Sequence, residues 1–229
     1  MIRTMPRHDG VDAPGNRAEA FFDDLWRQGD PWGFETSDYD QASYRHQVRL
    51  LSDRRYARAL EIGCGAGAFT RHLAPLVDRL LAIDVAPAAI HAARQALIGA
   101  GAVDFRVANI MESEPEPEAA WDLVVLGETI YYLGWLYPFF DVYWLAHRLL
   151  DATRPGGRLI MTNTSGGSEN YLQRPALIRT YRDLFINVGY ELSRDEVFTA
   201  RKNGTDFVAT ITVFAAPRSD TSGAPGGAA

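Results

Sequence analysis

The sequence has 229 residues, 47% of them hydrophobic, and this is enough apolar material for one continuous core. Its net charge of −6 at pH 7 argues against a nucleic-acid partner, and no apolar run approaches the roughly 20 residues of a membrane-spanning helix. The start lacks a secretory h-region and Cys64 is the single cysteine, so we expect a cytoplasmic protein without internal disulfides. We also expect a monomer or homodimer with no membrane partner.

Residues 1–15 and 218–229 have the composition of flexible ends, which leaves one domain over residues 16–217. Two helices are predicted first, over residues 16–27 with Asn16 as the cap and over residues 40–51. Strands and helices then alternate. The strands are expected at residues 58–62, 79–84, 103–109, 121–128 and 155–164, the helices at 68–77, 87–101, 136–150 and 174–188, an acidic loop at 112–120, and two closing strands at 189–200 and 205–216.

This alternation predicts an α/β protein with a three-layer, doubly wound and mostly parallel seven-stranded sheet, a Rossmann-like fold. The closing pair adds an antiparallel C-terminal strand. Residues 16–54 would form an N-terminal helical lid ahead of a catalytic core at 55–217. In such sheets ligands bind at the C-terminal ends of the strands, near the point where the strand order reverses.

A glycine loop, "EIGCGAGAFT", joins the first strand of the alternating region to the helix that follows. Gly63, Gly65 and Gly67 permit positive φ angles and a close approach of the backbone to a ligand. Asp84 ends the next strand about 20 residues further on, where a carboxylate can accept both hydroxyls of a ribose. The pattern favours an adenosine-containing cofactor over a glycine-rich turn that only packs a helix on a sheet.

Two cofactors share this plan, a nicotinamide dinucleotide and S-adenosyl-L-methionine. Glu61 precedes the loop, and a carboxylate there would repel a pyrophosphate. Two upstream helices suffice for a lid, and the sequence has no Tyr-x-x-x-Lys pair for hydride chemistry. The sequence thus favours S-adenosylmethionine, while an NAD(P)-dependent oxidoreductase and a non-catalytic cofactor-binding protein stay open as alternatives.

The segments "EIGCGAGAFT", "LAID", "VANI", "WDLVVLGETIYYL" and "PGGRLIMTNT", in this order, resemble class I S-adenosylmethionine-dependent methyltransferases. With "DPWGFETS" upstream and "GETIYYL" downstream, the sequence is similar to the nodulation protein S family. The resemblance implies the methyltransferase fold and N-methylation of the free amino sugar of a deacetylated chitin oligosaccharide, or of a related small acceptor. O-methylation of a small metabolite is the alternative. The "NPPY"-type motif of amide and base N-methyltransferases is absent, which again argues against nucleic acid.

The resemblance also implies roles for individual residues. Gly63 and Gly65 would line the methionine end of the cofactor, Glu61 would brace the loop through backbone N–H groups, and Asp84 would bind the ribose. The adenine would meet Val85, Asn109 and Ile110, although Asn109 could instead be a turn residue. Trp32 and Tyr39 would form an aromatic lid over the cofactor or, alternatively, a hydrophobic staple between helix and sheet.

Gly127 and Glu128 end the fourth strand, where the reactive methyl group should lie. Glu128 is the first candidate to orient an amine and accept its proton, with cofactor or structural binding as the alternative. Tyr131 or Tyr132 could orient the acceptor or contact the sulfonium, although core packing is the simpler role. His46 is a weaker candidate for a base. No cluster has metal-ligand spacing, so no metal is expected. Phe140, Tyr143, Trp144 and His147 fit a buried helical stripe, with an acceptor platform or a dimer face as the alternatives.

Overall fold

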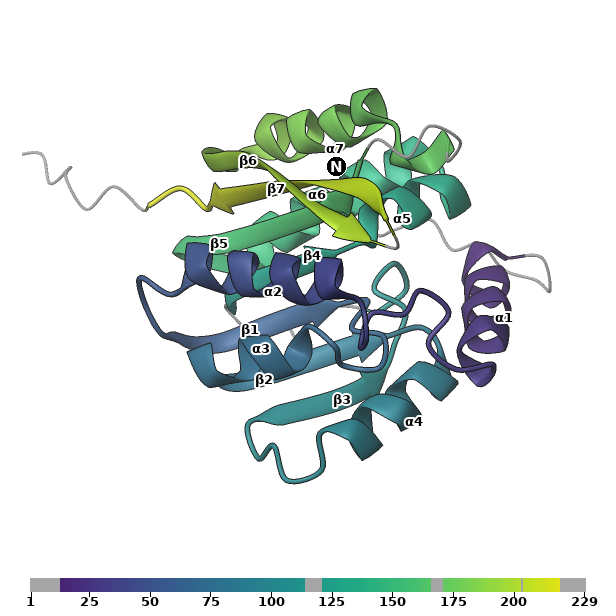
Figure 1. Cartoon of the computed structure of the whole chain (residues 1–229). Helices are drawn as coiled ribbons and strands as arrows, with labels where there is room; N and C mark the ends of the chain where they lie inside the picture. Colours follow the sequence, from purple (N-terminus) through teal and green to yellow (C-terminus); the bar gives the residue numbers. More distant parts are fainter. Residues whose placement is uncertain (1–12, 114–120, 166–170, 203, 219–229) are drawn as a thin grey trace, which may run out of the picture.

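The protein is described here by a computed structural model that covers residues 13–113, 121–165, 171–202 and 204–218. Seven strands form one sheet in the order β3-β2-β1-β4-β5-β7-β6 (Figure 1). The pairs from β3 to β5 are parallel, and β7 runs antiparallel to both β5 and β6. This confirms the predicted doubly wound α/β fold with a mostly parallel, seven-stranded sheet and an antiparallel C-terminal strand.

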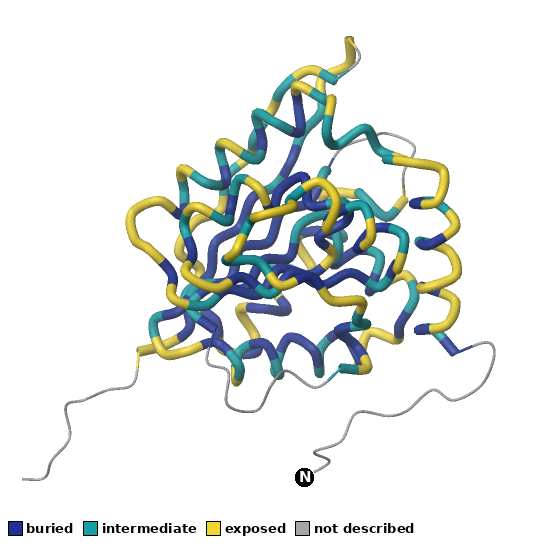
Figure 2. The backbone as a smooth tube through the Cα atoms, turned by 90° about the horizontal axis from the view of Figure 1, so that it is seen from below, coloured by how far each residue is buried: buried dark blue, intermediate teal, exposed yellow. Residues whose placement is uncertain are grey.

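The central strands are apolar on both faces because helices cover both sides of the sheet. The tube in Figure 2 is accordingly buried through the middle of the sheet. The seven strands are β1 (Tyr56–Ile62), β2 (Val77–Asp84), β3 (Val103–Val107), β4 (Trp121–Gly127), β5 (Thr153–Thr164), β6 (Glu191–Lys202) and β7 (Thr205–Ala215).

Helices α2, α3 and α4 pack on one face of the sheet, and α5, α6 and α7 pack on the other, so the molecule has three layers. Helix α1 stands beside the strand ends and contacts α4 (Figure 1). The helices are α1 (Pro14–Arg27), α2 (Asp38–Leu51), α3 (Thr70–Leu73), the 3₁₀ turn η1 (Ala74–Leu76), α4 (Pro87–Ala96), α5 (Ile130–Leu136), α6 (Phe139–Ala152), the 3₁₀ turn η2 (Tyr171–Gln173) and α7 (Pro175–Val188).

Three helix predictions were wrong in detail. The helix expected over 68–77 is one turn, α3, followed by η1, because β2 already begins at Val77. The helix expected over 136–150 is interrupted, since Pro138 lacks an amide hydrogen and becomes the N-cap of α6. Asn16 does not cap α1: the N-cap is Ala13, and Pro14 occupies the first turn.

The predicted buried stripe of α6 was also wrong. Phe140 is 60% exposed, and the helix instead turns an aliphatic face of the same spacing to the sheet. Aromatic and aliphatic stripes both satisfy a period of 3.6, so spacing alone does not decide which one is buried. The buried apolar residues of α6 are Val142, Leu145, Ala146 and Leu149.

The segment between α1 and α2 is held in shape by one carboxylate. Asp30 accepts hydrogen bonds from the amides of Trp32 (3.2 Å), Gly33 (2.9 Å) and Glu35 (3.0 Å). Ser37 then caps α2 by accepting a hydrogen bond from the amide of Asp40 at 3.2 Å. Helix α1 and this segment lie over the strand ends, whereas α2 packs on the sheet (Figure 1).

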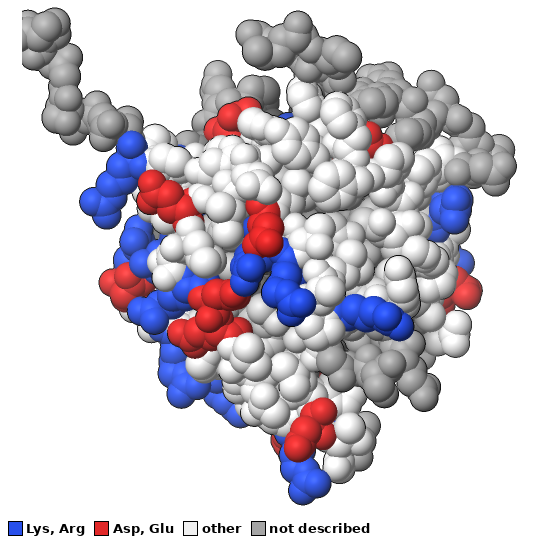
Figure 3. All heavy atoms as spheres, turned by 90° about the horizontal axis from the view of Figure 1, so that it is seen from above, with Lys and Arg blue, Asp and Glu red and all other residues white. Residues whose placement is uncertain are grey.

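Some predictions fall outside the described residues: most of the flexible ends at 1–15 and 218–229, and most of the acidic loop. Within the described residues, no helix combines the length and the apolar character needed to cross a bilayer. On the face shown in Figure 3, blue and red side chains are interspersed and a broad area is uncharged. That face therefore offers no continuous basic surface for a polyanion.

Candidate cofactor and acceptor site

A cavity of about 230 Å³ lies at the C-terminal ends of β1, β2 and β4, where the strand order reverses between β1 and β4. The structure brings together all the candidate site residues named from the sequence, although lining a cavity does not by itself assign their roles. They are Trp32, Tyr39, Glu61, Gly63, Gly65, Asp84, Val85, Asn109, Ile110, Gly127, Glu128, Tyr131 and Tyr132.

The glycine loop adopts left-handed backbone conformations, with φ angles of +77° at Gly63 and +54° at Gly65. Side chains of the protein itself also approach these glycines. A Cβ atom would lie 2.2 Å from Thr129 Oγ1 at Gly63, and 2.7 Å from Trp26 Cζ2 at Gly65. The loop is therefore fixed by its own packing before any ligand is considered.

Asp84 holds the loop from the neighbouring strand. Its carboxylate accepts hydrogen bonds from the amides of Gly65 and Ala86, both at 2.9 Å, while the carbonyl of Ile83 accepts from the amides of Gly63 and Cys64. Burial raises the pKa of Asp84, and the backbone donors oppose that rise. Asp84 thus braces the loop that Glu61 was predicted to brace.

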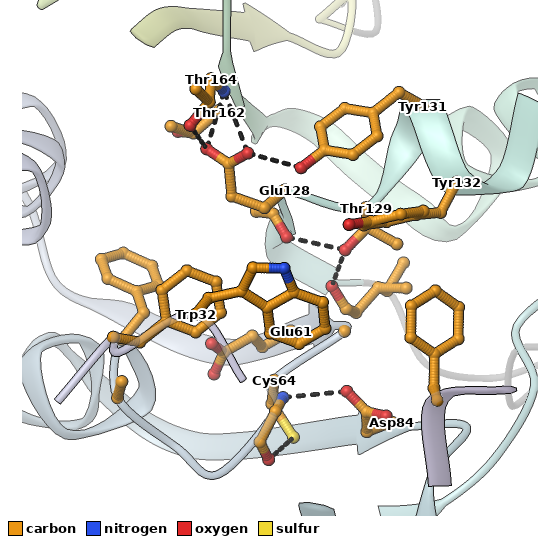
Figure 4. Close-up of a pocket in the computed structure, with 18 of the residues that line it drawn as sticks. Trp32, Glu61, Cys64, Asp84, Glu128, Thr129, Tyr131, Tyr132, Thr162 and Thr164 are labelled. Atoms are coloured by element: carbon orange, nitrogen blue, oxygen red, sulfur yellow. Dashed lines mark hydrogen bonds between the residues drawn. The ribbon is translucent and has the colours of Figure 1, made fainter. Parts of the chain in front are cut away.

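The Glu61 side chain lies in the cavity, close to Thr70 at the start of α3. Only 3% of the residue is exposed, and Oε2 has no hydrogen-bond partner within the described part of the chain. Burial raises the pKa of Glu61 to about 8; the nearby Thr70 hydroxyl opposes this rise, and the Asp84 charge adds to it. Figure 4 shows this carboxylate inside the cavity, beneath the Trp32 ring.

The end of the cavity predicted for adenine contains Val85, Asn109 and Ile110. Asn109 Oδ1 accepts from the Met111 amide at 3.1 Å, and Nδ2 donates to the Tyr137 hydroxyl at 2.7 Å. The turn role that was the alternative for Asn109 is therefore present. A carbonyl oxygen has two lone pairs, so one acceptor site on Oδ1 is left for a ligand.

Glu128 stands at the end of β4 in a strained conformation, with φ of +52°, the one positive φ angle of a non-glycine residue in the described ranges. Its carboxylate accepts from the Thr164 amide (2.8 and 3.0 Å), from the Thr164 hydroxyl (3.0 Å) and from the Tyr131 hydroxyl (2.8 Å), as Figure 4 shows. Burial raises the pKa of Glu128 against these donors. The group is fixed in place, faces the cavity and favours taking up a proton.

Aromatic rings form the wall above this carboxylate. Tyr131 and Tyr132 lie 4.6 Å apart, and Tyr132 meets Phe22 edge-on at 5.0 Å. Trp32 stacks on Phe34 at 5.5 Å and belongs to the segment over the site, not to a helix. Tyr39, in contrast, is 3% exposed and packs in the core beneath α2, which matches the staple alternative.

A polar stripe on α2, not predicted from the sequence, also borders the cavity. Asp40, Ser43 and Gln47 line the cavity although each is at most 7% exposed. Their spacing of three and four residues marks one helix face, and a polar face turned inward is the signal that could have revealed them. Lys202 of β6 also lines the cavity. His46 does not: it pairs with Glu196 of β6 at 2.9 Å, away from the cavity.

Two glycine substitutions distinguish a position where the fold requires glycine from a cavity position where it does not. Gly63→Ala is expected to lower the free energy of unfolding by roughly 1–3 kcal/mol, because Cβ meets Thr129 and the φ angle is positive. Gly127→Ala should change it by less than about 0.5 kcal/mol, because nothing lies within 4 Å of its Cβ. Urea unfolding of both variants measures the difference, and equal losses would contradict this account.

The strand order, the glycine loop and the acid that ends β2 together define the fold of the S-adenosylmethionine-dependent methyltransferases. The family model of nodulation protein S (NodS) matches residues 19–138, more than half of the chain. The chain therefore belongs to the nodulation protein S family, as its motifs predicted.

Individual proteins of this family are also similar to this chain in sequence. Nodulation protein S of Sinorhizobium fredii is 33% identical over 132 residues, 57% of this chain and 59% of that protein. The protein from Bradyrhizobium diazoefficiens is 38% identical over 105 residues, 45% of this chain and 49% of that protein. The matches thus span only about half of these relatives' length. Among solved structures, the N-methyltransferase NodS from Bradyrhizobium japonicum in complex with S-adenosyl-L-homocysteine superposes with a TM-score of 0.71 at 23% identity, over 88% of this chain and 99% of that one.

Proposed function

We propose that this protein is an S-adenosylmethionine-dependent methyltransferase that N-methylates an amino sugar or a related small saccharide. Residues 16–217 would act as one domain. The observation that carries the proposal is the buried Glu61 carboxyl group, which lines the cavity and whose Oε2 atom has no hydrogen-bond partner among the described residues. A buried acceptor of this kind requires a donor or a cation, which a bound cofactor would supply.

Charge supports this cofactor over a dinucleotide. The charged residues that line the cavity are Asp40, Glu61, Asp84, Glu128 and Lys202, so carboxylates dominate. S-adenosylmethionine carries a sulfonium and an ammonium, both of which these carboxylates attract. A pyrophosphate would instead face several negative groups, and each unfavourable pairing in a poorly solvated cavity costs free energy.

Different residues of the cavity would hold the different parts of the cofactor. Gly63, Gly65 and Gly127 leave room along its length, and Asp84 retains acceptor capacity for a ribose while it holds the loop. Glu61 would bind the ammonium end. Val85, Asn109 and Ile110 would contact the adenine, and the Trp32 ring would cover the cavity from the segment between α1 and α2.

When bound, S-adenosylmethionine supplies an electrophilic methyl group for in-line displacement by a nucleophile. The protein's part is alignment and exclusion of water, which the aromatic wall and α1 favour. An amine acceptor must be neutral to attack, so a proton has to leave it. Glu128 is placed to orient the amine and to take that proton, because its oxygens are fixed by Thr164 and Tyr131 and burial raises its pKa.

Saccharide as the acceptor class rests on two supports. The related Bradyrhizobium japonicum protein is an N-methyltransferase, and the resemblance to its family implies an amino sugar. The acceptor end of the cavity combines aromatic rings with hydroxyl and carboxylate groups, which suits a polar ring with an apolar face. O-methylation of a small metabolite is the alternative.

A thermal-shift comparison tests the cofactor. S-adenosylhomocysteine should raise the unfolding midpoint with increasing concentration, and NAD(P) should leave it unchanged, because only a ligand of the native state stabilises it. A shift with NAD(P) and none with S-adenosylhomocysteine would instead assign the protein to the oxidoreductases.

Labelled methyl transfer tests the acceptor. Partly deacetylated chitin oligosaccharides should accept methyl groups, and fully acetylated oligosaccharides of the same length should not, because only the former carry free amines. Transfer to both would point to hydroxyl acceptors. Tight cofactor binding without transfer to a broad acceptor panel would favour a non-catalytic protein.

A further inference from the structure

Lys202 is the only lysine in the sequence; the other 22 of its 23 basic residues are arginine. It lies near the tip of the β6–β7 hairpin, far along the chain from the glycine loop, and yet it lines the same cavity. The hairpin lies outside residues 19–138, the segment that the family model matches. This lysine is therefore a feature of this chain that the family match does not explain.

The ammonium group of Lys202 makes two short polar contacts. It donates to Asp40 Oδ2 at 2.6 Å and to the carbonyl oxygen of Trp32 at 2.9 Å. The two charged side chains are only 18% and 10% exposed, so this is a largely desolvated pair rather than a surface one. Removing one partner of such a pair strongly destabilises the protein, because the other charge is then left buried without compensation.

Aromatic rings complete the surroundings of this ammonium. Nζ lies 5.7 Å from the centre of the Phe34 ring and 6.0 Å from that of Phe207, within the range of cation–π attraction. Phe34 in turn stacks on Trp32. A compact ammonium satisfies two oxygens and two ring faces here, whereas a planar guanidinium requires a different geometry. This is a physical reason for a lysine in a chain that otherwise uses arginine.

We propose that Lys202 is a positioning residue of the site: it ties the hairpin to α2 and to the segment 28–37, and so holds Trp32 over the cavity. The inference rests on the proposed cofactor only in its binding test. By fixing the Trp32 backbone, Lys202 sets the depth of the cavity above Glu61 and Glu128, and it acts on the site through Trp32 and Asp40.

The test compares Lys202→Met with Arg201→Met. Methionine keeps the length of the apolar stem and removes the charge. Arg201 is the adjacent residue of the hairpin, and its contacts, with Asp206 and with the Gly204 carbonyl, are exposed. Lys202→Met should weaken S-adenosylhomocysteine binding by about tenfold or more in calorimetric titration, and Arg201→Met should leave it within about twofold. Lys202→Arg should recover only part of the affinity.

Amide hydrogen exchange supplies the readout that general destabilisation would not move. In Lys202→Met the peptide covering residues 28–37 should exchange faster, while peptides of β1 and β4 stay protected. Unchanged exchange in this segment overturns the proposal whether or not the protein binds the cofactor. If the wild type binds S-adenosylhomocysteine and Lys202→Met binds it equally well, the positioning role is refuted and the proposed function stands. If the wild type does not bind it, the proposed function fails, and exchange alone decides the role of Lys202.

Discussion

Replacement of Glu61 by Gln is expected to make the ligand-free protein more stable at pH 8 and, at the same time, a weaker binder of the cofactor. The folded-state pKa of Glu61 is about 8, whereas its usual value is 4.5. Stability from the protonated carboxyl is therefore fully present below about pH 4.5 and is lost as the pH rises through about 8. Gln cannot ionise and so does not lose it.

Unfolding in urea at pH 5 and at pH 8 measures this effect. The free energy of unfolding of the variant, relative to that of the wild type, should increase by roughly 1–3 kcal/mol from pH 5 to pH 8. The same substitution at exposed Glu191 reports the loss of a surface charge and should show no such growth. An advantage that is independent of pH would mean that Glu61 is not a buried, protonated group.

The affinity for the cofactor should depend on pH in the opposite sense to the stability of the ligand-free protein. If the cofactor's ammonium faces Glu61, binding favours the ionised carboxylate, and a proton is released below about pH 8. The affinity of the wild type for S-adenosylhomocysteine should thus rise with pH over this range, and Glu61→Gln should remove that rise. A pH-dependent affinity that persists in the variant would assign the proton to another group.

Glu128→Gln should lower the rate of methyl transfer by about 10²- to 10⁴-fold, while the affinity for S-adenosylhomocysteine stays within a few-fold. An amide can keep the local geometry: its oxygen accepts from the Thr164 amide, and its NH₂ group donates to the Tyr131 hydroxyl. What it cannot do is accept the proton of an amine. The substitution therefore removes chemistry with little change of shape.

Tyr131→Phe is the matched control for this experiment. It deletes one of the donors to Glu128 and leaves the carboxylate itself, so its effect on the transfer rate should be much smaller than that of Glu128→Gln. Single-turnover kinetics with saturating cofactor separates the transfer step from binding. Equal losses of rate and of cofactor affinity in Glu128→Gln would make this carboxylate a cofactor ligand and leave the proton acceptor to be found.

Most of the fold, and the cofactor end of the site, could be predicted from local sequence signals. Strand, glycine loop, helix, strand and acid follow one another in the chain, so Gly63 and Asp84 could be placed without knowledge of distant contacts. Two local predictions were wrong for local reasons, since Pro138 interrupts a helix and α6 offers two stripes of equal spacing. Spacing indicates that a face exists, but the packing partner decides which face is buried.

The acceptor side was less predictable because it is assembled from distant parts of the chain. Asp40 and Lys202 are separated by 162 positions and meet only when α2 packs against the hairpin. The glycine loop is likewise held by Asp84, which stands on the neighbouring strand β2. Such relations follow from tertiary packing and leave no mark in a short window of sequence.

The position of β7 has a consequence for the order in which the chain folds. It is the last strand of the described residues, yet it is inserted between β5 and β6. During synthesis, β5 must therefore present an unpaired edge until the ribosome has released residues up to Ala215, and such edges promote association between nascent chains. Lys202 reaches its partners at the same late stage. The glycine-loop half can form early, whereas the acceptor half waits for the last strand.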